Sequence, residues 1–452
     1  MRRHLIAGRF GNSDLADIPN ADGEVSTRLE FVVSKQRLEH DVSSSLDDLS
    51  KIGIFPTEIG LDLLVVAAHV QAADTRISRS TESQDDWTRE IRIVVPVSDT
   101  ARWNTAIPLV ERILNFLTGD RWTIGFRARP AGFEKTVPAR PRQLIPPTFD
   151  SLALFSGGLD SLIGAIDSLE QGKSPLLISH AGDDAVSAAQ NKLFDALNEN
   201  YPKLNIARLR ICMDFGKWRV HRVESEKTTR GRSFLFFATG VLAGTGLNKT
   251  FVLKVPQNGP MALNVPLDPL RLGSFSTRTT HPFYIARWNE LLGVLGISGL
   301  IENPYWDKTK GEMAANCSNP DLLGKLVPKS LSCASPSKSR WLGLGTGHCG
   351  FCLPCLIRRA ALLDTRDGTM YALSDLTARE LDTREAQGQQ IRSCQYAIEK
   401  IRRRPTLAPL YIHKPGPLSD ESPGRLLMLA EVYKRGLAEL AKLLAGVRAA
   451  PS

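Results

Sequence analysis

Residues 152–161 read Leu-Ala-Leu-Phe-Ser-Gly-Gly-Leu-Asp-Ser and join an apolar run to a helical pattern through two glycines. The run Leu152–Phe155 predicts a buried strand, and apolar residues at helical spacing follow it as far as Leu169. Glycine lets the backbone approach an anion closely, and the free N–H groups at a helix start favour negative charge. The stretch therefore predicts a strand, a tight turn and a helix N-terminus that bind a phosphate.

The side chains of this turn also suit a nucleotide. The hydroxyls of Ser156 and Ser161 can donate to phosphate oxygens, and Asp160 is a candidate Mg²⁺ ligand, directly or through water. An ordinary strand-to-helix turn is the alternative, but Ser-Gly-Gly-x-Asp-Ser between a strand and a helix favours nucleotide binding. The loop lacks the Gly-Lys-Ser/Thr of a Walker loop and resembles the PP-loop of ATP pyrophosphatases, which implies cleavage of ATP between the α- and β-phosphates. The predicted nucleotide-binding residues of the loop are Phe155, Ser156, Gly157, Gly158, Leu159, Asp160 and Ser161.

Strands and helices alternate throughout residues 149–330. This order predicts an α/β domain with a doubly wound parallel sheet, whose ligands bind at the carboxyl ends of the strands. The predicted strands are Leu152–Phe155, Leu176–Ser179, Ile206–Ile211, Phe251–Val255 and Gly299–Glu302. The predicted helices are Ser161–Glu170, Asp184–Asn200, Gly231–Leu242, Pro282–Leu295 and Lys308–Asn316.

Three further residues near strand ends are candidate ATP-binding residues. Ser179 and His180 end the second strand, where adenine would lie in a PP-loop protein, and His180 serves equally well as a packing residue. Arg232 opens a helix, where a cation opposes the helix dipole unless it faces an anion such as phosphate. A salt bridge from Arg232 to Glu224 or Glu226 is the alternative.

Lys310 is a third candidate catalytic residue, with Asp160 and Arg232. It stands at a helix start after the fifth strand, where a lysine can neutralise charge on the pyrophosphate leaving group. The alternative is an exposed helix cap in which Lys308 and Glu312 form an i,i+4 pair.

The loops after the fourth strand are candidate substrate-binding segments. Asn-Gly-Pro at 258–260 is a turn signal directly after a buried strand, at the predicted ligand edge. A later polar loop carries Arg278, which can bind an anionic ligand or simply remain solvated. The predicted substrate-binding residues are Asn258, Gly259, Asn264 and Arg278.

Four of the seven cysteines follow the spacing C-x15-C-x2-C-x2-C. Thiolates at x2 spacing can turn their sulfur atoms onto one ion, and tetrahedral Zn²⁺ accepts four of them. A structural zinc site is predicted, with an iron–sulfur cluster as the alternative and His348 or Cys317 as substitute fourth ligands. The predicted zinc ligands are Cys333, Cys349, Cys352 and Cys355.

Together these motifs resemble the QueC family of 7-cyano-7-deazaguanine synthases. The resemblance covers roughly residues 150–365, through the glycine loop, Lys-Thr-Lys-Gly-Glu at 308–312, Ser-Cys at 332–333 and the cysteine motif followed by Leu-Ile-Arg-Arg-Ala. It implies ATP, Mg²⁺ and a structural Zn²⁺ on four cysteines. It further implies adenylation of the carboxylate of 7-carboxy-7-deazaguanine, amide formation with ammonia, and ATP-dependent dehydration to a nitrile.

The sequence also departs from that family. The family's enzymes are shorter, and their substrate loop contains a Tyr-Pro-Asp-Cys-Arg-like stretch where residues 258–267 here read Asn-Gly-Pro-Met-Ala-Leu-Asn-Val-Pro-Leu. This favours a reaction that stops at the amide. Long QueC-like proteins of Qat anti-phage operons are similar, which implies transfer of the deazaguanine carboxylate to the N-terminal amine of a partner protein from the same operon. The alternatives are a nitrile synthase, a PP-loop tRNA-modifying enzyme and a non-catalytic nucleotide-sensing subunit.

The remaining sequence predicts flanking domains but does not indicate their function. Residues 1–145 mix strand-like runs at 29–34, 91–96 and 122–126 with helical spacing at 59–70 and 103–117, which predicts an α+β domain. A proline-rich linker at 138–148 leads into the ATP domain at 149–330. The zinc region at 331–365 precedes a helical extension at 366–452, with helical periodicity at 377–402 and 421–447.

Composition and charge limit the class of protein. The net charge of +9 is spread along 452 residues, so we expect a nucleotide or an acidic protein partner rather than a nucleic acid. An odd number of cysteines, three of them clustered, indicates metal in a reducing compartment. Without a membrane-length apolar stretch or a signal-peptide h-region, the expected location is cytoplasmic.

Overall fold

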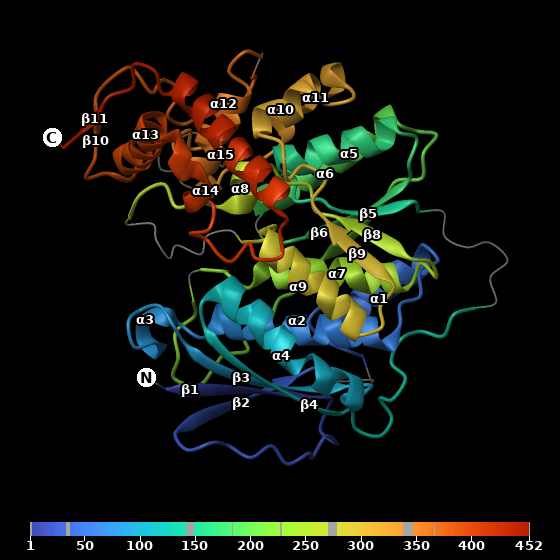
Figure 1. The fold of residues 1–452 in the computed structure, drawn as a ribbon. Helices are drawn as coiled ribbons and strands as arrows, with labels where there is room; N and C mark the ends of the chain where they lie inside the picture. Colours follow the sequence, from blue (N-terminus) through green and yellow to red (C-terminus); the bar gives the residue numbers. More distant parts are fainter. Residues whose placement is uncertain are drawn as a thin grey trace.

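A computed structural model shows two parallel sheets stacked with helices between them (Figure 1). From one end of the stack to the other, α5 and α6 cover the five-stranded sheet, α7 and α9 lie beneath it, and α2 and α4 separate these from the four-stranded sheet. Residues 142–148 of the predicted linker lie outside the described residues. The structure describes residues 2–32, 37–141, 149–182, 184–226, 228–269, 278–337, 347–365 and 367–451.

The central sheet contains five parallel strands in the order β7-β6-β5-β8-β9. The chain winds outward from β5 in one direction and then from β8 in the other, so the topological switch point lies between β5 and β8. This arrangement confirms the predicted α/β parallel sheet and puts the loop after β5 at the edge where such sheets bind ligands. The strands are β5 (Ser151–Leu154), β6 (Pro175–His180), β7 (Ala207–Ile211), β8 (Phe251–Lys254) and β9 (Gly299–Glu302).

Helices cover both faces of this sheet, as its double winding requires. One face packs against α5 (Leu159–Glu170), α6 (Asp184–Asn200), α10 (Lys310–Ala315) and α11 (Pro320–Leu326). The other face packs against α7 (Arg232–Thr245) and α9 (Pro282–Val294). All five helices predicted for this region are present, with boundaries shifted by a few residues.

The N-terminal region is a second parallel α/β layer, so the prediction of an α+β domain was wrong. Its four strands pair in the order β2-β1-β3-β4, and all three pairings are parallel. Helices connect β2 to β3 and β3 to β4, which is how parallel neighbours are usually joined. The strands are β1 (Arg3–Arg9), β2 (Glu24–Glu30), β3 (Glu90–Val97) and β4 (Arg121–Ala128). β1 was not predicted, and the predicted run 29–34 overlaps β2 only at residues 29 and 30, with residues 33 and 34 outside the described residues. The helices are α1 (Val42–Lys51), α2 (Glu58–Arg76), α3 (Arg79–Glu82) and α4 (Thr100–Thr118).

The two layers share one hydrophobic core. Helix α2 packs on α7, and α4 packs on α9, so one cluster of buried side chains runs from Phe10 in the first layer to Trp288 in the second. The approach is close enough that a Cβ on Gly60 would stand 2.5 Å from Oγ1 of Thr245. The N-terminal layer is therefore part of the body that carries the central sheet.

A buried ion network stabilises the N-terminal layer. Arg89 donates to Asp120 at 2.6 Å and to Asp74 at 2.8 Å, and Arg79 donates to Asp120 at 2.7 Å. The four side chains are at most 4% exposed. Asp74 also accepts a hydrogen bond of 2.7 Å from the backbone N–H of Gly231, which precedes α7. The network thus connects the first layer to the helix that carries Arg232.

Replacing Asp120 by Ala is expected to cost about 3–5 kcal/mol of unfolding free energy, because it leaves two buried arginines short of a counter-charge. Burial alone would raise the pKa of Asp120, but the attraction of Arg89 holds it below its ordinary value. The unfolding free energy that the Asp120 carboxylate contributes is therefore fully present at a pH above the ordinary pKa of aspartate. It is lost as the pH falls through the lowered pKa of Asp120. Denaturant unfolding at pH 7 measures the effect.

Glu90→Ala on the exposed face of the same layer is the matched control, because its partners Arg3 and Arg121 are 59% and 74% exposed. It should cost about 1 kcal/mol or less. Equal losses for the two variants would contradict the special role of the buried network.

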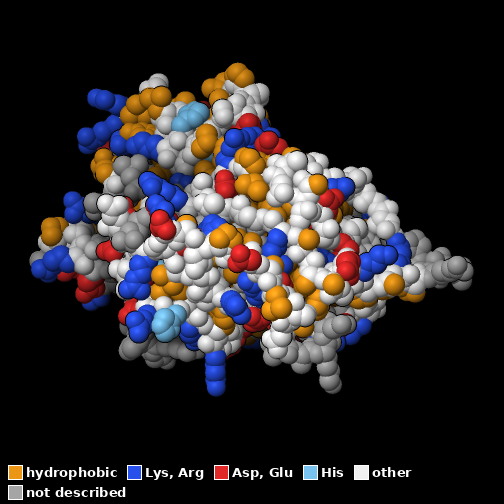
Figure 2. All heavy atoms as spheres, turned by 90° about the horizontal axis from the view of Figure 1, so that it is seen from below, with side chains coloured by type: hydrophobic (Ala, Val, Ile, Leu, Met, Phe, Trp, Pro, Cys, Tyr) orange, Lys and Arg blue, Asp and Glu red, His pale blue; other side chains and the backbone are white. Residues whose placement is uncertain are grey.

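Figure 2 shows the molecule from below, where Lys and Arg side chains are interspersed with Asp and Glu rather than gathered in one patch.

The C-terminal region forms its own helical core around α15. Helix α15 packs against α12, α13, α14 and the short α8. The predicted helical extension is present, although α13 begins nine residues after the predicted start at 377, and two short strands, β10 (Leu381–Asp382) and β11 (Ala449–Ala450), pair beside it. These helices are α8 (Gly259–Leu263), α12 (Leu353–Ala361), α13 (Ala386–Arg403), α14 (Ala408–Tyr411) and α15 (Pro423–Leu443). Among the described residues, no helix combines the length and apolar character that a membrane crossing needs.

Candidate nucleotide and metal site

The glycine loop leaves β5 and begins α5 with its backbone exposed to a cleft. Gly157 has φ +80°, a conformation that side chains other than hydrogen rarely adopt, and Gly158 is the residue before the first turn of α5. The segment before the cysteine cluster contacts the loop, because the N–H of Leu331 donates to the carbonyl of Gly157 at 2.8 Å. The predicted strand, turn and helix start are therefore all present.

The two loop hydroxyls converge at this helix start. Oγ of Ser156 and Oγ of Ser161 lie 3.2 Å apart, and the N–H of Gly158 donates weakly to Ser156 at 3.4 Å. Ser156 is exposed toward the cleft, Gly158 and Ser161 line the same cleft, and the hydroxyl of Ser161 donates to the carbonyl of Gly158 at 3.0 Å. Such a group of donors at the start of a twelve-residue helix suits a phosphate.

Asp160 and Lys310 form a buried ion pair beside the loop. Nζ of Lys310 lies 2.6 Å from Oδ1 of Asp160, and both residues are less than 10% exposed. The other carboxylate oxygen accepts from the side chain of Asn258 at 2.7 Å and from its backbone N–H at 3.2 Å. Two of the three predicted catalytic residues are thus in direct contact, and Asn258 orients the carboxylate.

Ser179, His180 and Arg232 also line the cleft, as predicted. The hydroxyl of Ser179 donates to the carbonyl of Phe155 at 2.8 Å, so it joins two strand ends. Burial, followed by the charge of Arg232, lowers the pKa of His180 to about 4, which keeps the ring neutral near pH 7. Arg232 is exposed at the start of α7 with its guanidinium 5.5 Å from the ring of Phe236. A neutral ring and a cation thus stand across the cleft from the loop.

One cleft of ≈ 1450 Å³ joins all these groups. It reaches from the loop along the ends of β5, β6, β7 and β8 to Cys333 and Pro354 in the cysteine region. Gly157 is the one predicted loop residue that does not line it, because it is covered by Gln190. Lining residues that were not predicted include Gln190, Phe236, Gln257, Thr279 and Ser332.

The four predicted cysteines lie together and could hold a metal ion such as zinc. Their Sγ atoms all lie within 4.8 Å of one another, although Cys333 precedes Cys349, the nearest of the other three in sequence, by 16 positions. Sγ of Cys333 and Cys352 are 3.9 Å apart, as are those of Cys349 and Cys355. Sulfurs around a tetrahedral Zn²⁺ at about 2.3 Å would be about 3.8 Å apart, so the cluster fits zinc.

The polar surroundings of the sulfurs also suit thiolates. The N–H groups of Ser335 and Cys349 point at Sγ of Cys333, and that of Cys352 points at Sγ of Cys349. Such donors stabilise negative sulfur and are expected around a closed structural metal site.

Buried polar contacts connect the cluster to the glycine loop. Arg358 on α12 is fully buried and donates to Ser330 at 2.8 Å and to Ser332 at 3.3 Å. The hydroxyl of Ser332 accepts in turn from the N–H of Leu159 at 3.3 Å. The backbone N–H of Ser332 donates to His348 at 3.1 Å, so His348 supports this segment and is not among the clustered ligands. The cysteines therefore hold in place the segment that touches the loop.

The four predicted substrate residues do not form one site. Gly259 is packed against Trp306, where an added Cβ would approach the carbonyl oxygen to 2.3 Å. Arg278 donates to the carbonyl of Phe116 on α4 at 2.6 Å and lies over its ring, away from the cleft. Asn258 and Asn264 cap the two ends of α8 and line a second cavity behind the Asp160–Lys310 pair. The structure therefore brings Asn258 and Asn264 to one cavity and leaves Gly259 and Arg278 apart from it.

Replacing Gly157 by Ala is expected to destabilise the loop by about 1–2 kcal/mol and to weaken ATP binding. The added Cβ would have to adopt φ +80° and would lie 3.1 Å from Cγ of Gln190. Gly172→Ala is the control, because that residue has φ +70° but nothing within 4 Å of the added atom. It should lose stability through strain while keeping ATP affinity, as measured by thermal unfolding and calorimetric titration. Equal ATP affinities for the two variants would contradict the role given to the loop.

No protein-family model, curated protein or solved structure matches the chain.

Proposed function

We propose that this protein is an ATP-dependent carbon–nitrogen ligase that adenylates a carboxylate and transfers the acyl group to an amine. The observation that carries the proposal is the single cleft that joins the glycine loop, the buried Asp160–Lys310 pair and Cys333 of the metal cluster. A phosphate-binding loop at the switch point supports a nucleotide, and the adjoining cleft leaves room for a second planar ligand. The motif resemblance supports 7-carboxy-7-deazaguanine as the carboxylate.

In this proposal the loop binds the phosphates of ATP. The backbone at Gly158 and the hydroxyls of Ser156 and Ser161 hold the α-phosphate region, while Arg232 faces the β- and γ-phosphates from α7. The substrate carboxylate attacks the α-phosphorus, the bond to the β-phosphate oxygen breaks, and pyrophosphate leaves with that electron pair. Lys310 neutralises charge that develops on the leaving group.

The two metals have different roles in the proposal. Mg²⁺, held near Asp160, would supply charge neutralisation for the phosphates. Zn²⁺, held by the four cysteines, would be structural and would fix Ser332 beside the loop. A protein partner from the same operon, with its N-terminal amine as acceptor, is the partner that the resemblance supports.

Isotope exchange between pyrophosphate and ATP tests the first half of the reaction. Purified protein with ATP, Mg²⁺ and 7-carboxy-7-deazaguanine should exchange labelled pyrophosphate into ATP, and omission of the carboxylate should remove the exchange. Benzoate serves as a control for an unspecific aromatic carboxylate. Exchange that does not respond to the deazaguanine would reject this substrate, and no exchange with it would reject the proposed reaction.

A further inference from the structure

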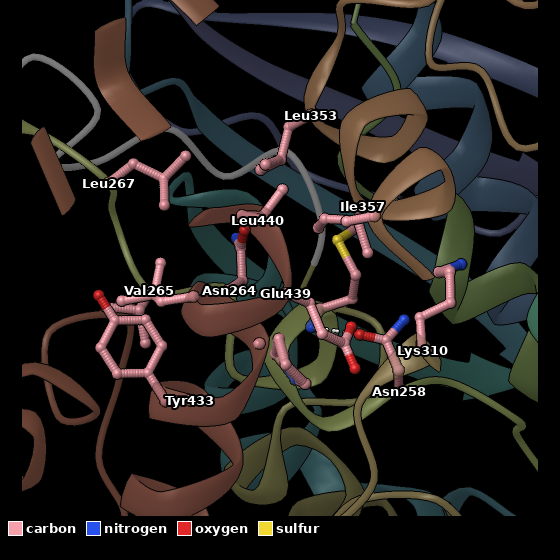
Figure 3. Close-up of a pocket in the computed structure, with 15 residues that line it drawn as sticks. Asn258, Asn264, Val265, Leu267, Lys310, Leu353, Ile357, Tyr433, Glu439 and Leu440 are labelled. Atoms are coloured by element: carbon pink, nitrogen blue, oxygen red, sulfur yellow. Dashed lines mark hydrogen bonds between the residues drawn. The ribbon is translucent and has the colours of Figure 1, made fainter. Parts of the chain in front are cut away.

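A second cavity lies directly behind the Asp160–Lys310 pair. Helices α8, α12 and α15 enclose it, and most of its lining is apolar (Figure 3). The apolar lining includes Met261, Val265, Leu353, Ile357, Leu437 and Leu440. This apolar lining suits a ligand with a hydrocarbon chain.

Polar groups gather at one end of this cavity. Figure 3 shows Asn258, Lys310 and Glu439 there, with Leu353 and Leu267 toward the opposite side. Glu439 accepts from the hydroxyl of Thr309 and from the N–H of Gly311, at 3.3 Å for the latter. A carboxylate has about four lone-pair sites, so two remain for a ligand. A negative group at the end of an apolar cavity suits an ammonium or amine.

The cavity adjoins the nucleotide cleft on one side and the surface on the other. Met261 and Lys310 line both this cavity and the cleft. On the other side, Leu267 and Tyr433 also line a third cavity, whose wall includes Lys400. The three cavities therefore follow one another from the surface to Asp160.

From this arrangement we infer that the cavity behind Lys310 binds the acceptor: a primary amine on an apolar chain, with its nitrogen at the Glu439 end. The inference rests on the proposed ligase activity and specifies its second substrate. Since Lys310 is already paired with Asp160, Glu439 provides the negative charge that attracts a second cation. Ammonia, which has no chain, would gain nothing from the apolar wall.

The amine reacts at the acyl carbon of the adenylate. Its lone pair forms the C–N bond, the bond from that carbon to the AMP oxygen breaks, and AMP leaves with the electron pair. The bound ammonium first gives one proton to the carboxylate of Glu439, which frees the lone pair, and the second proton, released after the C–N bond forms, passes to solvent water. Burial raises the pKa of Glu439 above its ordinary value, which makes the carboxylate a better proton acceptor.

Two variants test the cavity through its two ends. Glu439→Gln removes the charge but keeps the size, and Leu440→Phe fills the apolar part. Their controls are Glu431→Gln and Leu427→Phe, two exposed positions on the same helix. Each protein is assayed for pyrophosphate exchange, for hydroxamate formation with hydroxylamine, and for amide formation with n-hexylamine or with a leucine-rich peptide that has a free amino terminus.

Both cavity variants should keep exchange and hydroxamate formation within about twofold of wild type and lose amide formation by about tenfold or more, a change of about 1.4 kcal/mol in the barrier. The two amine probes distinguish a small amine from a polypeptide end, and use of either one supports the cavity. If Leu440→Phe also loses pyrophosphate exchange, amide formation by Glu439→Gln alone tests the inference. Undiminished amide formation in Glu439→Gln, or a wild type that uses ammonia but neither probe, overturns the inference. A wild type without exchange overturns the proposed ligase itself.

Discussion

Asp160→Asn is expected to lower carboxylate-dependent pyrophosphate exchange by about 100-fold or more, because removing a charged group that organises a phosphoryl site costs several kcal/mol of transition-state stabilisation. The carboxylate stands at the first turn of α5, beside the phosphate-binding loop, with Lys310 at 2.6 Å. The amide keeps the size and one acceptor atom while removing the charge. Steady-state exchange at saturating ATP and Mg²⁺ measures the loss.

A second variant separates catalysis from stability. Asp160→Asn alone leaves Lys310 buried without its counter-charge, which should lower the melting temperature. The double variant Asp160→Asn/Lys310→Met removes both charges and should recover stability while staying inactive. Asp195→Asn, on the exposed side of α6, is the control and should behave as wild type. Activity in the double variant would contradict the catalytic role of the pair.

Cys355→Ser is expected to remove the metal and cost several kcal/mol of unfolding free energy, on the order of 3 kcal/mol or more, because metal binding and folding are coupled. Cys355 is fully buried at the start of α12, next to the other three sulfurs. Metal analysis of wild type should find about one zinc per chain, as expected for one four-cysteine cluster. Calorimetric unfolding with and without a strong chelator should give the same loss for wild type plus chelator as for the variant.

The loss of metal should also reach the nucleotide. Ser332 precedes Cys333 and contacts the N–H of Leu159, so a loosened cluster should weaken ATP binding as well. Cys212→Ser is the matched control, since Cys212 is exposed and distant in sequence from the cluster. A Cys355→Ser protein that stays stable and retains its zinc would refute the ligand assignment.

The sequence predicted those parts of the site that are formed by residues close together in the chain. The apolar run before Ser156 and the helical spacing after Ser161 determine the β5–α5 turn, and the x2 spacing determines how three sulfurs meet. Cys333 was predicted from residue type alone, and the structure brings it to the others through the contacts of residues 330–332 with Arg358.

Other features depended on contacts between distant parts of the chain. Arg278 carries the charge of an anion-binding residue, but its partner is the carbonyl of Phe116, 162 positions earlier. β1 contains few apolar residues between two arginines, so its pattern is weak, and its burial comes from α2 and the neighbouring strands. Glu439 belongs to a helix that was predicted from its periodicity, and only the position of α15 beside α10 brings its carboxylate to Thr309.

The core shared by the two layers has a consequence for synthesis on the ribosome. The faces of α2 and α4 that point away from the first sheet are covered by α7 and α9, which are translated more than a hundred residues later. Until α9, ending at Val294, has left the exit tunnel, the nascent N-terminal layer must present those apolar faces to water or to a chaperone. Its first 130 residues therefore cannot complete their folding as an independent early unit, despite having a full set of strands.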